Sequence, residues 1–130
     1  MKKIYTTADL TEHQIQACVM EWAEGQLIQR PELKMLYAIP NGGARNAVTG
    51  ALLKAEGVKR GVPDLCLPVA RGKYHGLYIE MKRASGKPTK AQIQWLYDLK
   101  DQGYATAISH DAALTADLIL RYLAGAAVGE

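Results

Sequence analysis

Residues 61–82 read GVPDLCLPVARGKYHGLYIEMK, and this stretch decides the fold. Two mainly apolar runs, at 64–69 and 77–82, flank a connection at 71–76 that contains two glycines, which predicts two strands joined as a hairpin. Pro63 presets an extended entry into the first strand, because its ring fixes φ. Strands joined in this way run antiparallel, which excludes a purely parallel, doubly wound sheet.

Three charged residues of this stretch are predicted to meet at one end of the hairpin. Side chains two apart in a strand share a face, so Glu80 and Lys82 project together. The start of the first strand lies opposite the end of the second, which brings Asp64 beside them. A Glu-x-Lys pair alone is common and is typical of a solvated strand face. With Asp64 added, the pattern indicates a site.

The combination of two carboxylates and an ammonium is costly to assemble unless a cation shares the site. Mg²⁺ takes oxygen ligands and needs only one or two carboxylates. We therefore expect Asp64, Glu80 and the Met81 carbonyl to hold Mg²⁺ for phosphodiester hydrolysis, with the ion polarising the phosphate and activating a water. Lys82 would orient or deprotonate that water, or stabilise charge on the phosphate. The alternative is a buried cluster of ion pairs that binds no metal.

The remaining segments alternate between helical and extended patterns. Helices are expected at 11–24, 44–55, 89–103 and after Asp111, and further strands at 33–40 and 104–109. Thr11 and Gln14 form a capping box, and Thr89 and Asp111 are expected as N-caps. The order α-β-α-β-β-α-β-α predicts an α/β fold with a small mixed sheet flanked by helices.

Length and composition limit the class of protein. A chain of 130 residues fits one domain, here 1–130, and 48% hydrophobic with 22% charged residues excludes disorder and coiled coil. Cys18 and Cys66 lie in apolar surroundings and are expected as small buried side chains rather than a disulfide. Asp117 and Arg121 interrupt the apolar residues 112–128, so no membrane span is expected and we expect a cytoplasmic protein.

The net charge of +3 is unevenly distributed along the chain. Between residues 45 and 90 ten Lys/Arg accompany three Asp/Glu, a net of +7, and the rest of the chain carries six against ten, a net of −4. A basic centre is typical of a surface that meets a polyanion, although the same charges could be scattered over a solvated face. The candidate phosphate contacts are Arg45, Lys54, Lys59, Arg60, Arg83, Lys87 and Lys90, with Asn41 in a glycine turn that could offer backbone N–H groups.

Glu12 is a further candidate for the site and for the metal. It lies about one turn before Ile15, at the edge of the apolar stripe of the first helix. It could equally complement the helix dipole, since it lies in the first turn. The three histidines of the chain lack the spacing of zinc ligands. Trp95 fits the helical register and is expected in the core rather than as a stacking platform for a base.

Pro63-Asp64 followed by Glu80-Met81-Lys82 resembles the signature of PD-(D/E)xK nucleases. The surrounding residues are most similar to one branch of these enzymes, the virus-type replication-repair nuclease (VRR-NUC) family. The matching pieces are Pro40-Asn41-Gly42-Gly43, residues 61–65 and 75–82, Gly86-Lys87, Gln92, Trp95 and Gly103. Each piece is short, but their order and spacing extend the resemblance from about residue 12 to residue 109.

This resemblance implies a restriction-endonuclease-like core and a Mg²⁺- or Mn²⁺-dependent DNA endonuclease. It implies metal ligation by Asp64 and Glu80, catalysis by Lys82, and supporting roles in the site for Glu12 and Gln92. Small stand-alone members of the family, from phages and bacteria, act as homodimers on branched DNA such as four-way (Holliday) junctions, in repair or recombination. We expect this chain to be of that type.

Two alternatives stay open at this point. Members that sit within longer chains cut flaps or DNA ends, and a catalytically silent DNA-binding module could keep the same fold. The presence of Asp64, Glu80 and Lys82 together argues against the silent module. A hydrolase of small nucleotides is disfavoured because no glycine-rich loop joins a strand to a helix. Symmetric cutting of a junction would require two sites related by a twofold axis, which favours a homodimer.

Overall fold

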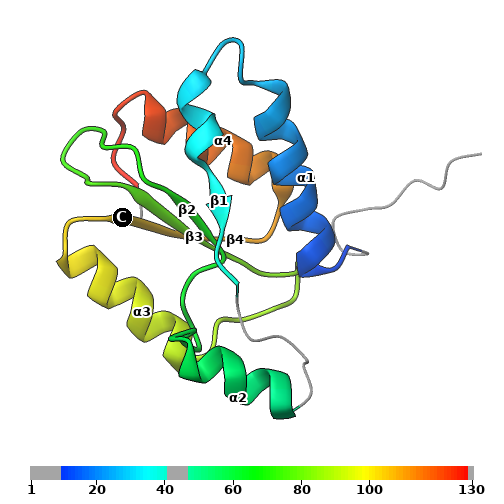
Figure 1. Cartoon of the computed structure of the whole chain (residues 1–130). Coiled ribbons are helices and arrows are strands. Elements are labelled where there is room, and N and C mark those ends of the chain that lie inside the picture. Colours follow the sequence, from blue (N-terminus) through cyan, green and yellow to red (C-terminus); the bar gives the residue numbers. More distant parts are fainter. Residues whose placement is uncertain (1–9, 41–46, 129–130) are drawn as a thin grey trace, which may run out of the picture.

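The computed structural model describes residues 10–40 and 47–128, and a four-stranded sheet lies at its centre (Figure 1). The strands stand side by side in chain order: β1 (Tyr37–Ala38), β2 (Leu65–Leu67), β3 (Leu77–Met81) and β4 (Ala105–Ser109). β2 pairs antiparallel with both β1 and β3, whereas β4 runs parallel to β3. The predicted hairpin and the predicted mixed sheet are both confirmed.

Helices flank this sheet on both sides. In the described ranges they are α1 (Glu12–Gly25), the 3₁₀-helix η2 (Pro31–Met35), α2 (Ala47–Ala55), α3 (Lys90–Asp101) and α4 (Ala112–Leu123). α1 and α4 lie together on one side of the sheet, and α3 lies on the other (Figure 1). The expected α/β architecture is therefore confirmed. Within the same ranges no helix combines the length and the apolar character that crossing a membrane requires.

Local sequence signals set the starts of three helices. At α1 the Thr11 N–H donates to Gln14 Oε1 at 2.9 Å, and the Gln14 N–H donates to Thr11 Oγ1 at 3.1 Å. Thr89 and Gln92 form the same reciprocal pair at the start of α3, and the Asp111 carboxylate caps α4. These caps satisfy backbone N–H groups that would otherwise lack a partner, as the sequence predicts.

The core lies between the sheet and the pair of helices α1 and α4. Its fully buried side chains come from alternate positions of β2 and β3 and from the facing sides of the two helices: Leu65, Leu67, Leu77, Ile79, Met81, Ile15, Val19, Ile119 and Tyr122. Burying one such side chain contributes roughly 1.5–3 kcal/mol. Because a one-residue shift would turn this apolar set outward, the core also fixes the register of the strands.

The strand expected at 33–40 is wrong over most of its length. Pro31–Met35 forms a 3₁₀-helix, and only Tyr37–Ala38 pair with β2. The proline starts this helix at a position whose N–H needs no helical partner. Leu33 and Leu36 lie three residues apart and are both buried, which is the spacing that a 3₁₀ turn brings to one side. The helix expected at 44–55 is observed from Ala47, since residues 44–46 lie outside the described ranges.

The two cysteines differ in environment. Cys66 is buried in β2 as expected, but Cys18 on α1 is exposed, so its predicted burial is wrong. The buried residues of α1 follow a four-residue spacing, Ile15, Val19 and Ala23. Cys18 precedes Val19 by one position and is therefore rotated by about 100° from that line around the helix axis.

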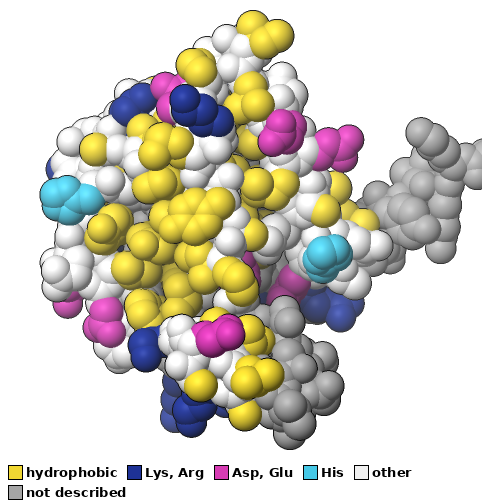
Figure 2. Space-filling view, in the orientation of Figure 1, with side chains coloured by type: hydrophobic (Ala, Val, Ile, Leu, Met, Phe, Trp, Pro, Cys, Tyr) yellow, Lys and Arg dark blue, Asp and Glu magenta, His cyan; other side chains and the backbone are white. Residues whose placement is uncertain are grey.

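The face of the sheet opposite α1 and α4 is aromatic and partly open. Tyr37, Cys66 and Tyr78 are direct cross-strand neighbours, and the Tyr78 ring meets the Tyr104 ring edge-on at 5.3 Å. Tyr37 remains half exposed. In Figure 2 hydrophobic side chains form a broad area in the middle of the molecule, over β1 and its neighbours. An apolar surface therefore stays accessible beside this edge of the sheet.

Tyr122→Phe is expected to destabilise the fold. Tyr122 is fully buried, and its hydroxyl donates to the Val69 carbonyl at 2.5 Å. Loss of this donor leaves a buried carbonyl without it, at a cost of about 1–3 kcal/mol. Urea unfolding followed by circular dichroism measures the change. Tyr97→Phe, at an exposed position of α3, is the matched control, and equal losses in the two variants would contradict the prediction.

Candidate active site

Asp64 is fixed between two strands at one end of the sheet. Its side-chain Oδ2 accepts a hydrogen bond from the Met81 N–H at 2.8 Å. Its backbone carbonyl accepts from the Ile39 N–H, also at 2.8 Å. The antiparallel register pairs Leu65 with Ile79, so Asp64 lies beside the end of β3. The hairpin therefore brings Asp64 and Glu80 together in the way that the sequence predicts.

Glu80 is a buried carboxyl group with an unused oxygen. Only 1% of the residue is exposed, and among the described residues its Oε1 has no hydrogen-bond partner. The pKa of Glu80 is raised to about 9, first by burial and then by hydrogen bonding with Asp64 and by the negative charge of Asp64. The nearby Lys82 charge opposes this shift. Without a bound cation the Glu80 side chain is therefore a neutral acid at pH 7.

Lys82 continues β3 and reaches toward α1. Its backbone N–H donates to the Ser109 carbonyl at 2.9 Å, which extends the pairing with β4 by one residue. The residue is 7% exposed, and its Nζ lies 3.8 Å from Glu12 Oε1. The Glu12 carboxylate, at the start of α1, is itself about half exposed. Glu12 thus belongs to the same cluster, joined to it through Lys82.

The residues present fit a divalent cation with oxygen ligands. The unpartnered Glu80 Oε1 is buried next to a second carboxylate, that of Asp64, and the Met81 peptide adjoins both. In the described parts of the chain no three His, Cys, Asp or Glu side chains gather closely enough to hold a metal by themselves. Mg²⁺ does not need three, because it commonly uses one or two carboxylates and keeps waters. Asp64 and Glu80 are the pair that could hold it.

Gln92 has a structural contact in addition to any role in the site. It is half-buried in the first turn of α3, where its Oε1 accepts from the Thr89 N–H at 2.8 Å. This contact completes the capping box and uses the oxygen of the amide. A direct contact of Gln92 with a substrate could use its amide nitrogen or the second lone pair of Oε1.

The candidate phosphate contacts lie on both sides of the acidic cluster in the chain. All six that the structure describes are exposed, and none forms an ion pair with another described residue: Lys54, Lys59, Arg60, Arg83, Lys87 and Lys90. Dark-blue side chains accordingly appear around the end of α2 in Figure 2. Asn41 and Arg45, which the sequence also predicts, lie outside the described residues. The exposed cations are free to meet an anionic partner.

Two side-chain contacts that the sequence did not predict hold the backbone next to Lys82, in the loop at 83–88 and at the end of β4. His110 Nε2 lies 3.1 Å from the Gly86 carbonyl, which ties the loop at 83–88 to the end of β4. The Ser109 and Thr115 hydroxyls are 2.5 Å apart and join that end of β4 to α4. A single histidine without metal-ligand spacing gives no sequence signal for a contact of this kind.

Trp95 is partly exposed rather than in the core. Its indole N–H donates to the Arg60 carbonyl at 3.1 Å, so the ring links α3 to the loop that precedes Asp64. The buried residue of α3 is its neighbour Leu96. The prediction that Trp95 lies in the core is therefore wrong by one position along the helix. The helical period of apolar residues alone does not distinguish two adjacent positions.

Comparison with known proteins agrees with this fold. The family model described as VRR-NUC domain matches residues 5–112. A solved structure named "VRR_NUC domain protein" is similar, with a TM-score of 0.76 and 31% sequence identity. The alignment covers 92% of this chain and 93% of that chain. None of the curated proteins is similar enough to count as a match.

Glu80→Gln is expected to flatten the pH dependence of stability in the metal-free protein. The raised pKa means that Glu80 keeps its proton in the folded protein up to about pH 9, whereas in the unfolded chain it ionises near 4.5. The unfolded state therefore binds fewer protons over that window, and folding stability falls as pH rises through it. The variant lacks this ionisable group. The unfolding free energy of the variant minus that of the wild type is therefore expected to increase from pH 5 to pH 9.

Urea unfolding in EDTA at pH 5, 7 and 9 measures that difference between the variant and the wild type. Glu21→Gln, at an exposed position of α1, is the matched control and is expected to show no such trend. A difference between wild type and Glu80→Gln that stays constant with pH would contradict the assignment.

Proposed function

The chain belongs to the VRR-NUC family of PD-(D/E)xK nucleases, and on that premise we propose that it is a metal-dependent deoxyribonuclease that hydrolyses phosphodiester bonds. The observation that carries the proposal is the buried Glu80 oxygen without a hydrogen-bond partner among the described residues. It lies next to Asp64, and the positive charge of Lys82 acts on the same carboxyl group. A buried carboxyl oxygen without a hydrogen-bond partner is costly to keep in a fold unless it has a ligand. The whole chain, 1–130, would form one nuclease domain.

Asp64 and Glu80, with the Met81 carbonyl, are the proposed ligands of Mg²⁺ or Mn²⁺. When bound, such an ion neutralises charge on the phosphate and makes a water a stronger nucleophile. The protein supplies a fixed position, because the Met81 N–H and the Ile39 N–H hold Asp64 from two sides. Because the raised pKa holds the proton on Glu80, a cation must displace that proton to bind, and metal binding is expected to strengthen as pH rises.

Lys82 is the proposed catalytic base or electrostatic group, and Glu12 positions it. The ammonium lies in a nearly buried place, where a charge acts more strongly on a neighbouring anion than it would in water. The Glu12 carboxylate, 3.8 Å from Nζ, restrains the side chain from the α1 side. The charge of Glu12 also contributes, as the smallest cause, to the raised pKa of Glu80, and we propose Glu12 as a further candidate ligand. Gln92 would assist from the first turn of α3.

We propose branched DNA, such as a four-way junction, as the substrate, and a homodimer as the acting form. The six exposed cations on either side of the acidic cluster suit contacts to phosphates, which orient DNA without reading its sequence. Cutting two strands symmetrically would use two copies related by a twofold axis. Acting on DNA would place the protein in the cytoplasm of a bacterium or of a phage-infected cell. The alternatives are a nuclease for flaps or ends and a silent DNA-binding module.

Replacing Asp64, Glu80 or Lys82 by Ala is expected to lower the cleavage rate at least about 100-fold while DNA binding is largely kept, because each side chain acts on the reacting phosphate. Gel assays on a labelled four-way junction with Mg²⁺, with Mn²⁺ and with EDTA measure the rate. Arg121→Ala, in an exposed ion pair on α4, is the control and is expected to leave the rate unchanged. Full activity of Glu80→Ala, or full activity of the wild type in EDTA, would contradict the proposal.

The substrate assignment predicts paired cuts in the junction and none in a linear duplex of the same sequence. Cleavage of junction, flap, duplex and single-stranded DNA by the wild type is compared on one gel, and sedimentation gives the mass of the free protein. Junction cutting by a dimer is the expected result. Cutting of flaps or ends alone would replace the junction assignment, and a gel shift without any cutting would favour the silent module.

A further inference from the structure

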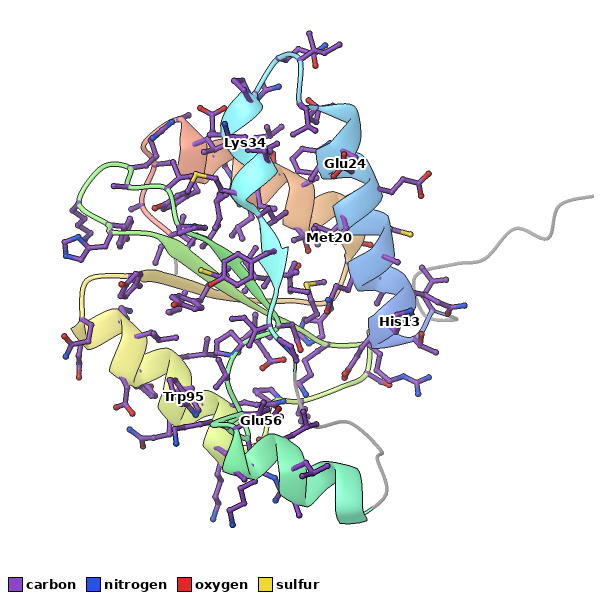
Figure 3. All side chains as sticks on the ribbon, in the orientation of Figure 1. His13, Met20, Glu24, Lys34, Glu56 and Trp95 are labelled. Carbon is purple, nitrogen blue, oxygen red and sulfur yellow. The ribbon has the colours of Figure 1, made fainter. Side chains whose placement is uncertain are left out.

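A pocket of about 390 Å³ opens between the end of α2, the end of β1 and α3. Its walls are mainly apolar, with one carboxylate and one ammonium among the residues that line it, which include Trp95, Ile39, Val58, Val62, Glu56 and Lys59. Figure 3 shows Trp95 on α3 and Glu56 just beyond α2, beside each other at this place. The volume lies near the lower end of the range of small-molecule sites, roughly 300–1,000 Å³.

This pocket adjoins the candidate active site through the backbone. The Ile39 N–H donates to the Asp64 carbonyl at 2.8 Å, so one wall residue is hydrogen-bonded to a proposed metal ligand. Another wall residue, Val62, comes two positions before Asp64 in the chain. A nucleotide whose phosphate lies at Asp64 and Glu80 would therefore have the pocket within reach of its own base or of a neighbouring one.

Trp95 is held in place before any ligand arrives. Its indole N–H is bonded to the Arg60 carbonyl, which fixes the orientation of the ring. The adjoining Gly61 has a φ of +89°, and a Cβ there would lie 2.9 Å from the Ala91 carbonyl carbon, so the loop packs directly on the backbone of α3. An aromatic side chain that is already ordered loses little entropy when a flat ring stacks on it.

The Glu56 carboxylate and the Lys59 ammonium that line the pocket balance each other, so the pocket carries no net charge and suits a neutral base. The Glu56 carboxylate at its rim repels a phosphate but can accept a hydrogen bond from an amino group of a base. The exposed side chains of Lys54 and Arg60 lie on the two segments that lead to and from the pocket, where they suit the phosphates on either side of such a base. Apolar walls and an indole ring likewise suit a flat, neutral ring.

We propose that this pocket binds one unpaired nucleobase of the DNA strand that is cut, stacked on Trp95. This inference rests on the proposed nuclease function and, at the same site, favours branched DNA that carries unpaired nucleotides over a fully paired four-way junction. A base inside a duplex would first have to leave its stack, which costs a few kcal/mol, whereas an unpaired base enters freely. The pocket would thus select DNA with unpaired nucleotides beside the scissile phosphate, by shape and without reading sequence.

Tryptophan fluorescence tests this directly, because the chain has two tryptophans, Trp22 and Trp95. In the full-length Trp22→Phe variant Trp95 is the only tryptophan left. It is titrated in EDTA with a DNA hairpin that carries a short unpaired extension, and with the same hairpin whose extension is abasic. Quenching by the first DNA and not by the second is expected. Trp95→Phe, which leaves Trp22 alone, is expected to show no base-dependent quenching.

Affinity gives the second measurement. One stacked base is worth about 1–3 kcal/mol, so Trp95→Ala is expected to weaken binding of the extended hairpin roughly 5- to 150-fold and binding of the abasic one hardly at all. Trp95→Phe keeps an aromatic ring and is expected to bind much like the wild type, which separates stacking from misfolding. Tyr97→Ala, an exposed aromatic of the same helix outside the pocket, is the matched control.

The two proposals fail in different ways in these assays. Equal quenching by both DNAs, or equal loss of affinity for both in Trp95→Ala, would overturn the base pocket even if the wild type cuts DNA. Base-dependent quenching without any cleavage by the wild type would support the pocket and overturn the nuclease.

Discussion

The hydrogen bond from the Met81 N–H to Asp64 Oδ2 joins the two strands that carry the site, and the rest of the arrangement depends on the register that it marks. In that register the apolar side chains of β2 and β3 enter the core together. Glu80 then reaches Asp64, and Lys82 reaches Glu12. A shift by one residue would expose the core face and separate the two carboxyl groups at once. Stability and chemistry therefore impose the same pairing.

Glu80 shows that this agreement has a cost. Its carboxyl group is buried with one oxygen unpartnered among the described residues, whereas an apolar side chain such as Met at that position would bury no unpartnered polar atom. The fully buried layer of Leu, Ile and Met beneath the sheet offsets that cost. Strain of this kind gathers where a fold gives up stability for a function. The apolar packing of the sheet against α1 and α4 thus compensates for the unpartnered group near the end of β3.

The hairpin and its acid pair could be predicted from sequence because strand alternation and antiparallel pairing leave little freedom over so short a connection. That reasoning placed Asp64 beside Glu80. The prediction failed for residues 33–40, because a 3₁₀-helix and a strand can have the same apolar content. It also failed for Cys18 and Trp95, because on a helix a shift of one position separates a buried side chain from an exposed one. The contacts of side chains with distant backbone carbonyls depend on tertiary packing, which no local pattern encodes.

The mixed direction of the strands also bears on the order in which the molecule assembles. β2 and β3 close through a short local connection, so Asp64 and Glu80 meet at little cost in chain entropy. The parallel pairing of Leu77 with Ala105 joins two segments that are separated in the chain by the whole of α3. Contacts so distant in sequence slow folding. The hydrogen bond that anchors Lys82 to Ser109 belongs to that more distant pairing. The acid pair thus depends on the hairpin alone, whereas the complete constellation depends also on the pairing of β3 with β4.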